Sequence, residues 1–327
     1  MPMAWQPAPL SAPYPLPTLA KQTNQPLPSG FALEQYRVDR KISHGGFSIV
    51  YLAHDDAGTA YAIKEYLPAG IAVREGNNPA PVVLPEKRRA FMLGMKSFFE
   101  EARLLANINH PNVVRVLNFF RANETAYLVM PYESGVSLQQ YLRLPSGAAD
   151  SGNEAFLRDM FVRLLAGLRE VHARKLLHLD IKPANIFVRR DGTPILLDFG
   201  ATRLGLGEAN VNLMAINTPG FAAPEQEGSG EPLGPWTDIY AVGATMYFCL
   251  ASIAPPRARD RLKEDLLEPA AQRGVGRYSP QLLDLIDWCL KLSIAERPQS
   301  VFTLQKVLGG ELLDLVDPSW FPAQPPS

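Results

Sequence analysis

One short run of the chain carries the side chains that transfer of a phosphoryl group requires. Residues 178–185 read HLDIKPAN, and the tripeptide DFG follows at 198–200. The polar groups are a carboxylate, an ammonium, a carboxamide and a second carboxylate: Asp180, Lys182, Asn185 and Asp198. The reaction needs a base that orients the attacking hydroxyl, a cation that neutralises developing charge, and oxygen ligands for Mg²⁺. A lone His-x-Asp is more often a polar loop that caps strands, but fixed residue types in two linked segments favour the catalytic interpretation.

A glycine-containing turn upstream could bring backbone N–H groups close to phosphate. Residues 42–51 predict a strand, a turn of small residues and a second strand, with Gly45 and Gly46 in the turn. Small side chains let backbone N–H groups approach phosphate oxygens. Ser43 and Ser48 stand where a complete G-x-G-x-x-G pattern would have its outer glycines. Taken alone, the pattern therefore favours an ordinary Gly-Gly hairpin.

A lysine and a glutamate are expected to form an ion pair. Lys64 ends an apolar strand, where an isolated lysine would normally mark the exit to water. In the helix predicted over about 94–107, four residues at i, i+3, i+4 and i+7 share one face: Phe98, Glu101, Ala102 and Leu105. An unpaired carboxylate in an apolar stripe is costly, so Lys64 is the natural partner of Glu101. The alternative is that Glu101 lies at the edge of the stripe and points to solvent.

Together these motifs resemble those of the bacterial eukaryotic-like serine/threonine protein kinases, over about residues 36–308. The resemblance implies an α+β, bilobal protein-kinase-like fold. The small N-lobe would be rich in β-strands and contain one key helix, and the larger C-lobe would be α-helical. ATP would bind between the two lobes.

The resemblance also implies a role for each polar residue. Asp180 would orient the substrate hydroxyl and accept its proton, and Lys182 would contact the transferred phosphoryl group. Lys64 would hold the α- and β-phosphates of ATP and pair with Glu101. The implied Mg²⁺ ligands are Asn185 and Asp198.

Further matches lie towards the C-terminus. The tripeptide APE at 223–225 would end the activation segment, and Asp238 follows in a WTDIY run. By resemblance, Arg297 in an ERP run would pair with Glu225. These matches favour a protein substrate over a small molecule, and the Lys-Pro pair of the catalytic loop is more typical of serine/threonine than of tyrosine kinases.

The resemblance extends to the residues that would surround ATP. Met130 would guard the back of the adenine pocket. Pro131 has no N–H, but the family uses the carbonyl at this position and the N–H two residues later, at Glu133. The positions implied to contact ATP are Ile42, Gly45, Gly46, Val50, Ala62, Lys64, Met130, Pro131, Glu133 and Phe187.

The rest of the chain divides by composition. We expect a disordered Pro-rich arm over 1–30, a kinase N-lobe over 31–133 with an insertion at about 66–93, a kinase C-lobe over 134–310 and a short tail over 311–327. The insertion is longer than a strand-to-helix link needs. It could contact a partner, brace the helix that bears Glu101, or be a tolerated surface loop.

Composition limits the classes of partner and the cellular compartment that we expect for this protein. The chain has 327 residues, a net charge of −1 and 46% hydrophobic residues, which gives no electrostatic footprint for nucleic acid. Cys249 and Cys289 lie in apolar helical patterns and are expected to be buried free thiols in a reducing cytoplasm. No secretory leader is evident. The longest apolar run, 241–254, is too short to span a bilayer and predicts a buried helix.

Two departures from the family pattern concern regulation. Leu179 replaces the arginine that in many kinases clamps a phosphorylated activation loop. Residues 201–222 contain no serine or tyrosine and only Thr202 and Thr218, and Thr218 is expected to touch the catalytic loop. The sequence therefore predicts a kinase that does not depend on activation-loop phosphorylation.

The resulting prediction is a protein kinase that uses ATP and Mg²⁺ to phosphorylate serine or threonine hydroxyls of protein substrates. One rival is a pseudokinase that binds nucleotide without catalysis, and another is a small-molecule phosphotransferase. Analogy with relatives adds a cognate phosphatase or a phosphopeptide-binding protein as candidate partners.

Overall fold

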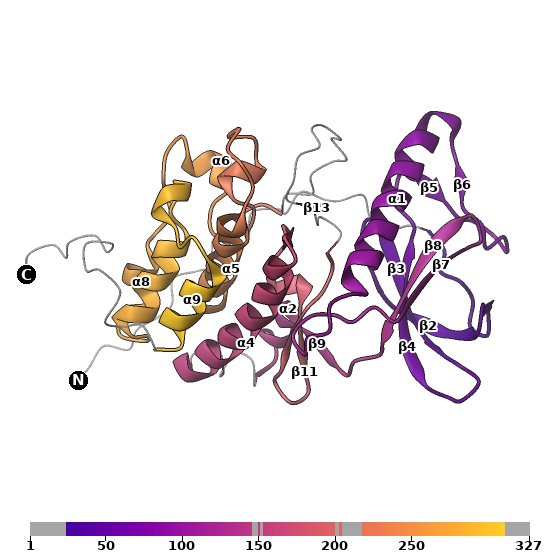
Figure 1. The fold of residues 1–327 in the computed structure, drawn as a ribbon, viewed down its shortest axis with the longest axis horizontal. Coiled ribbons are helices and arrows are strands. Elements are labelled where there is room, and N and C mark those ends of the chain that lie inside the picture. Colours follow the sequence, from indigo (N-terminus) through magenta and orange to yellow (C-terminus); the bar gives the residue numbers. More distant parts are fainter. Residues whose placement is uncertain (1–23, 146–149, 151–152, 200–202, 205–217, 311–327) are drawn as a thin grey trace, which may run out of the picture.

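The computed structural model describes residues 24–145, 150, 153–199, 203–204 and 218–310. Within these ranges the chain forms two lobes (Figure 1). One contains a twisted sheet and a long helix, and the other is mainly helical. This is the α+β, bilobal arrangement that the sequence predicted.

The N-lobe is built on a six-stranded antiparallel sheet. In spatial order its strands are β1 (Ala32–Leu33), β2 (Tyr36–His44), β3 (Ser48–His54), β4 (Ala60–Tyr66), β8 (Thr125–Pro131) and β7 (Asn118–Ala122). Because side chains alternate along a strand, Ile49, Tyr51 and Ala53 of β3 are buried on one face. Ile63 and Glu65 of β4 lie opposite β3 residues of this face and are also buried. We call this the outer face of the sheet, because Lys64 points to the other side.

Helix α1 (Arg88–Leu105) carries the stripe that the sequence predicted. Phe98, Glu101, Ala102 and Leu105 are all buried, which excludes the alternative of a solvent-facing Glu101. The helix begins at Arg88 rather than near residue 94, because the 3₁₀ turn η1 (Pro85–Lys87) leads directly into it.

The insertion between β4 and α1 folds as a small hairpin. Its strands are β5 (Ala72–Val73) and β6 (Val82–Val83). At its start, the Tyr66 ring packs against Phe91 and Phe98 of α1, with centroid distances of 5.3 and 5.7 Å. Gly94 gives the ring room in this position, since a Cβ there would overlap the Tyr66 hydroxyl. The first residue of the insertion is therefore packed against α1, so the insertion is not a detached surface loop at this end.

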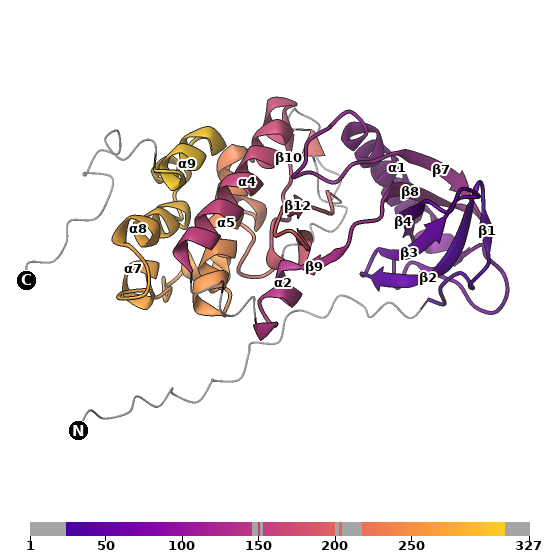
Figure 2. The same ribbon diagram turned by 90° about the horizontal axis from the view of Figure 1, so that it is seen from below.

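Helices dominate the C-lobe (Figure 2). They are α2 (Leu138–Tyr141), α4 (Glu154–Ala173), α5 (Pro235–Ala251), α6 (Ala258–Arg261), α7 (Ala270–Arg273), α8 (Pro280–Cys289) and α9 (Val301–Leu308). Asn153 caps α4 by accepting the Ala155 N–H at 3.0 Å. The apolar stripe of α4, including Phe161, Leu164 and Leu168, is fully buried, and the helix packs against α9.

Short strands and 3₁₀ turns support the polar loops of the C-lobe. They are β9 (Gly135–Ser137), β10 (Leu176–Leu177), η2 (Pro183–Asn185), β11 (Ile186–Arg189), β12 (Pro194–Leu196), β13 (Arg203–Leu204), η3 (Pro224–Gln226) and η4 (Ile294–Glu296). Strands β12, β11 and β9 form one small sheet, in the order β12-β11-β9, and β10 pairs with β13. The polar loop 178–185 lies between β10 and β11, and Asp198 comes soon after β12.

The buried helix predicted over 241–254 is present but starts earlier and ends sooner, as α5 (Pro235–Ala251), which is enclosed on nearly every side. It ends at Ala251 because Ser252 adopts a left-handed backbone conformation. Cys249 and Cys289 are free and buried, as the sequence predicted, and burial raises the pKa of the Cys249 thiol to about 12. Among the described residues, none of the helices combines the length and apolar character needed to cross a membrane.

Candidate active site

The Asp180 carboxylate is held in one orientation by its neighbours. Lys182 Nζ donates to its two oxygens at 2.9 and 2.8 Å, and Asn185 Nδ2 donates to Oδ2 at 2.7 Å. Thr218 Oγ1 donates to Asp180 Oδ1 at 3.1 Å and accepts from Lys182 Nζ at 2.7 Å. The Asp180 side chain nevertheless remains 17% exposed. An oriented, accessible carboxylate is suited to accept a proton from a hydroxyl.

The backbone of this loop is anchored by Asp238, in the first turn of α5. Its buried carboxylate accepts the N–H groups of His178 and Leu179 at 2.9 and 2.8 Å, and lies 2.7 Å from His172 Nε2. Burial would raise the pKa of Asp238, but the hydrogen bond and charge of His172 outweigh it and lower the pKa. Leu179 adopts a φ of 63°, in the left-handed region that few non-glycine residues occupy. The two bonds from the Asp238 carboxylate hold this unusual backbone in place.

His178 links the catalytic loop to the segment that bears Asp198. Its Nε2 donates to the Leu197 carbonyl at 2.9 Å, and its Nδ1 accepts the Asp180 N–H at 3.3 Å. The ring also packs against Phe199, with centroids 4.4 Å apart. Both hydrogen bonds require the neutral imidazole, and burial lowers the pKa of His178 accordingly. Sequence reasoning noted this residue only as part of the motif and assigned it no role.

Lys64 contacts two carboxylates, one from each lobe. Its Nζ lies 2.5 Å from Asp198 Oδ1 and 4.0 Å from Glu101 Oε1. The predicted contact with Glu101 is present, but the closer partner is Asp198, which the sequence did not predict. Burial alone would lower the pKa of Lys64, yet the charges of Asp198 and Glu101 raise it. The charge of Lys64 in turn lowers the pKa of Asp198, so the closer pair, Lys64 and Asp198, is ionised at neutral pH. Burial has the opposite effect on Glu101 and raises its pKa, although the charge of Lys64 counteracts it.

The other residues expected to contact ATP lie on the elements around Lys64. Val50 stands opposite Lys64 in the β3–β4 register, and Ala62 stands opposite Met130 in the β4–β8 register. Directly opposed residues share a face of the sheet, so these four side chains lie on the face opposite to Glu65. The remaining positions are Ile42 on β2, Gly45 and Gly46 in the β2–β3 turn, Pro131 at the end of β8, Glu133 in the link between the lobes and Phe187 on β11.

The two residues expected to bind Mg²⁺ are neighbours in the fold. The Asn185 carbonyl accepts the Leu197 N–H at 2.9 Å, which places Asp198 directly beyond it. A carboxamide and a half-exposed carboxylate offer the oxygen donors that Mg²⁺ prefers. Among the described residues, no group of three or more His, Cys, Asp or Glu side chains is placed to hold a metal. Asn185 and Asp198 would therefore fit a Mg²⁺ ion that took its other ligands from outside the protein.

Two further contacts that the resemblance implied are present. Thr218 touches the catalytic loop, as described above. Arg297 forms a bidentate pair with Glu225, at 2.7 and 2.9 Å, and Thr237 Oγ1 also donates to Glu225. Gly200 and Thr202, which the sequence analysis also named, lie outside the described residues.

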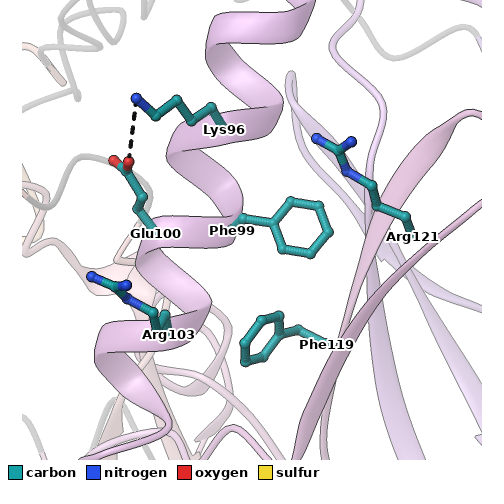
Figure 3. Close-up of a pocket in the computed structure, with 6 residues that line it drawn as sticks. All are labelled: Lys96, Phe99, Glu100, Arg103, Phe119 and Arg121. Atoms are coloured by element: carbon teal, nitrogen blue, oxygen red, sulfur yellow. Dashed lines mark ion pairs between the residues drawn. The ribbon is translucent and has the colours of Figure 1, made fainter.

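A separate pocket lies between α1 and β7 (Figure 3). Its aromatic residues, Phe99 and Phe119, meet edge to face with centroids 5.9 Å apart, and Arg121 lies over the Phe99 ring. Lys96 and Glu100 pair at 3.7 Å on its border. None of the residues expected to contact ATP lines this pocket, so it is distinct from the candidate active site.

Comparison with known proteins identifies the family of this chain. Residues 36–308 match the protein kinase domain family. Serine/threonine-protein kinase Nek1 of mouse is 32% identical over 216 residues, which are 66% of this chain and 16% of that kinase. Serine/threonine-protein kinase C of Synechocystis is 29% identical over 290 residues, which are 84% of this chain and 50% of that kinase. The chain thus spans half or less of the length of these relatives.

Solved structures show the same fold. The apo form of PpkA-294 superposes with a TM-score of 0.78 at 33% identity, covering 86% of this chain and 99% of that chain. The kinase domain of Mycobacterium tuberculosis PknI superposes with a TM-score of 0.62 at 21% identity, covering 88% of this chain and 99% of that chain, and supports the fold alone. The chain therefore belongs to the protein kinase family and resembles its bacterial, eukaryotic-like serine/threonine members.

Proposed function

We propose that this protein is a serine/threonine protein kinase that transfers the γ-phosphoryl group of ATP, with Mg²⁺, to hydroxyls of protein substrates. The observation that carries the proposal is the Asp180 carboxylate, which Lys182, Asn185 and Thr218 hold in place while it remains accessible. A pseudokinase would have no need to keep this set intact. The names of the relatives support serine/threonine specificity. The buried free thiols suit a reducing cytoplasm.

Each residue then has a distinct part in the reaction. When bound, ATP supplies the phosphoryl group, and Mg²⁺ at Asn185 and Asp198 neutralises phosphate charge. Asp180 orients the acceptor hydroxyl and takes its proton. Lys182, within 3 Å of Asp180, adds positive charge where the phosphoryl group is transferred. Lys64 positions the α- and β-phosphates from the opposite lobe.

Protein substrates are favoured over small molecules by the Glu225–Arg297 pair. It fastens the end of the activation segment to the body of the C-lobe through two buried hydrogen bonds. A fixed segment beside the catalytic loop provides a platform on which a polypeptide can lie. Nucleotide-dependent phosphorylation of small molecules does not require such a platform.

The decisive experiment replaces Asp180 by Asn and follows both binding and transfer. We expect phosphorylation of protein substrates in a cell lysate, measured with radiolabelled ATP, to fall by roughly 10²–10⁴-fold. ATP affinity should barely change, because Asp180 does not hold the nucleotide. An inactive wild-type protein that binds ATP would indicate a pseudokinase. An Asp180→Asn variant that keeps full activity would show that another residue is the base.

We further propose that activity does not depend on a phosphorylated activation loop. Leu179 is buried and cannot pair with phosphate, and the hydroxyl of Thr218 is engaged by Asp180 and Lys182. Protein treated with a phosphatase and then freed of it should retain most of its activity. Thr218→Ala should lower activity, Thr218→Glu should not restore it, and Thr202→Ala should be nearly neutral. A large loss on dephosphorylation that maps to Thr202 or Thr218 and is reversed by rephosphorylation would refute this proposal.

A further inference from the structure

A second charged cluster lies on the outer face of the N-lobe sheet, away from the candidate active site. Its centre is the Glu65 carboxylate, which is 0% exposed. Arg74 directly follows strand β5 of the insertion hairpin, and it donates to both carboxylate oxygens at 2.6 and 2.8 Å. The hydroxyls of Tyr51 and Tyr127 each donate to Glu65 at 2.7 Å. The cluster therefore ties the hairpin to three adjacent strands.

Strand β4, which carries Glu65 on the outer face, carries Lys64 on the opposite face. Because β4 side chains alternate, fixing Glu65 on the outer face also fixes the direction in which Lys64 leaves the strand. Just beyond β4, the Leu67 and Ala69 N–H groups donate to the carbonyls of Phe47 and Gly46, at 2.8 and 2.7 Å. These bonds hold the β2–β3 turn, which is the segment expected to cover the phosphates of ATP. Anything that fixes the end of β4 therefore also fixes this turn.

Arg74 also holds the chain that precedes the sheet. Its Nε donates to the Gln25 carbonyl at 2.8 Å, and its backbone N–H donates to Asn24 Oδ1 at 2.7 Å. The Leu27 N–H donates to the Tyr51 hydroxyl at 3.1 Å, and the Leu27 side chain is buried. A single arginine thus joins the extended segment 24–27, the hairpin and β4.

The segments that flank the hairpin connect it to α1, whose N-cap residue is Lys87. Tyr66 packs against the rings of Phe91 and Phe98, and Lys87 Nζ donates to the Gly70 carbonyl at 2.6 Å. Helix α1 bears Glu101, the N-lobe partner of Lys64. The Arg74 cluster is consequently linked to the phosphate-covering turn and to the helix that bears Glu101 through the residues that directly follow Glu65. Lys64 is the residue that directly precedes Glu65 on β4.

We propose that Arg74 is a positioning residue for nucleotide: through Glu65 it fixes the end of β4 and the β2–β3 turn in the arrangement that receives the phosphates of ATP. The proposal rests on the proposed kinase function and adds to it a residue from the insertion. It also makes the segment 24–27 part of the unit that orders the nucleotide site. Neither Arg74 nor Glu65 contacts the reacting groups themselves.

The test compares Arg74→Met with the double variant Arg74→Met/Glu65→Gln in the full chain. The single variant leaves Glu65 charged and buried without its partner, whereas the double variant removes that charge and is expected to recover melting temperature. Both should lose roughly 10–10²-fold in kcat/KM for ATP, with KM for the protein substrate unchanged, because the phosphate site is displaced. Amide hydrogen exchange at Leu67 and Ala69 should rise in both.

Arg261→Met is the matched control, because Arg261 is also a buried arginine, in the C-lobe, that pairs with Asp265. It should lower melting temperature without changing kcat/KM for ATP or the exchange of Leu67 and Ala69. If the double variant keeps wild-type kcat/KM for ATP and wild-type exchange at both amides, Arg74 only stabilises the fold and the proposal is overturned.

Hydrogen exchange separates this inference from the proposed function. A wild-type protein that transfers no phosphate would refute the kinase activity but leave the exchange measurement valid. Faster exchange at Leu67 and Ala69 in the Arg74 variants would then still support the positioning role, and unchanged exchange would refute it.

Discussion

Among the residues that the structure describes, the N-lobe and the C-lobe each contain an arginine–glutamate pair whose side chains are almost completely removed from water. In the C-lobe, Arg297 and Glu225 are both 0% exposed, and in the N-lobe Arg74 and Glu65 are 2% and 0% exposed. Both pairs are bidentate, and in each the carboxylate accepts additional hydroxyl donors. The chemistry of the two pairs is thus nearly the same.

The pairs differ in what the arginine holds besides the glutamate. Arg297 donates to the carbonyls of Lys291, Leu292 and Trp236, all within the helical frame of the C-lobe. Arg74 instead donates to the Gln25 carbonyl of the preceding segment and to the Pro79 carbonyl of the hairpin. One pair fastens the end of the activation segment to the C-lobe, and the other joins separate segments of the N-lobe that flank the strand bearing Lys64. We therefore expect the Arg297–Glu225 pair to stabilise the C-lobe, and the similar Arg74–Glu65 pair to position the nucleotide site.

The largest expected effect is on the stability of the C-lobe, through the Arg297–Glu225 pair. Arg297→Met would leave Glu225 charged and buried, which should cost about 3–5 kcal/mol of the free energy of unfolding. Chemical denaturation should show this loss, and Arg297→Met/Glu225→Gln should recover part of it. ATP affinity of the folded fraction should stay at the wild-type value. A fall in kcat/KM for ATP as large as that expected of the Arg74 variants would remove the contrast between the two pairs.

The next effect concerns Lys64 and Glu101, a largely buried pair whose charged atoms are too far apart for a hydrogen bond. We expect this pair to contribute to catalysis rather than to the stability of the C-lobe. Lys64→Met and Glu101→Gln should each lower kcat by about 10²-fold, or about 2.7 kcal/mol, as loss of one aligned electrostatic group does. The double variant should be no worse than the more impaired single variant, because the two residues act as a unit. Strictly additive losses in log rate would show that the 4.0 Å contact has no role in catalysis.

The smallest expected effect is a pH dependence of the melting temperature that arises from His178 in the C-lobe. The folded protein holds His178 neutral with a lowered pKa, whereas the unfolded chain takes up a proton as the pH falls through the ordinary value of 6.5. The unfolded state then binds more protons, so the stabilising contribution is complete above that value and is lost below it. Melting temperature should fall between about pH 7 and pH 5.5, a window around the ordinary histidine pKa.

His178→Phe provides the control for this dependence. The variant should be less stable at neutral pH, because it loses both hydrogen bonds of the imidazole, but its melting temperature should change less between the two pH values. His110, whose pKa burial also lowers, remains in both proteins and contributes equally. Equal slopes in the two proteins would show that His178 does not carry the effect.

Much of the candidate active site could be predicted because its chemistry is local in sequence. Asp180, Lys182 and Asn185 fall within six positions of one loop, so their types and spacing identify the reaction before any fold is known. The 3.6-residue period of α1 likewise placed Glu101 on the buried face, where its charge demanded a partner. At these positions, residue type and helical periodicity are sufficient to predict the role of the side chain.

The partners of the charged groups were decided by tertiary structure. Lys64 lies 134 positions from Asp198, its nearest carboxylate, and the two meet only because the lobes pack against each other. Arg74 and Glu65 are nine positions apart, but no strand or helix period relates them, and they meet because the hairpin folds back over the outer face. A sequence shows that a buried charge needs a partner, since leaving it unpaired is costly. Which partner it finds depends on the path of the chain between them, and that path is set by packing.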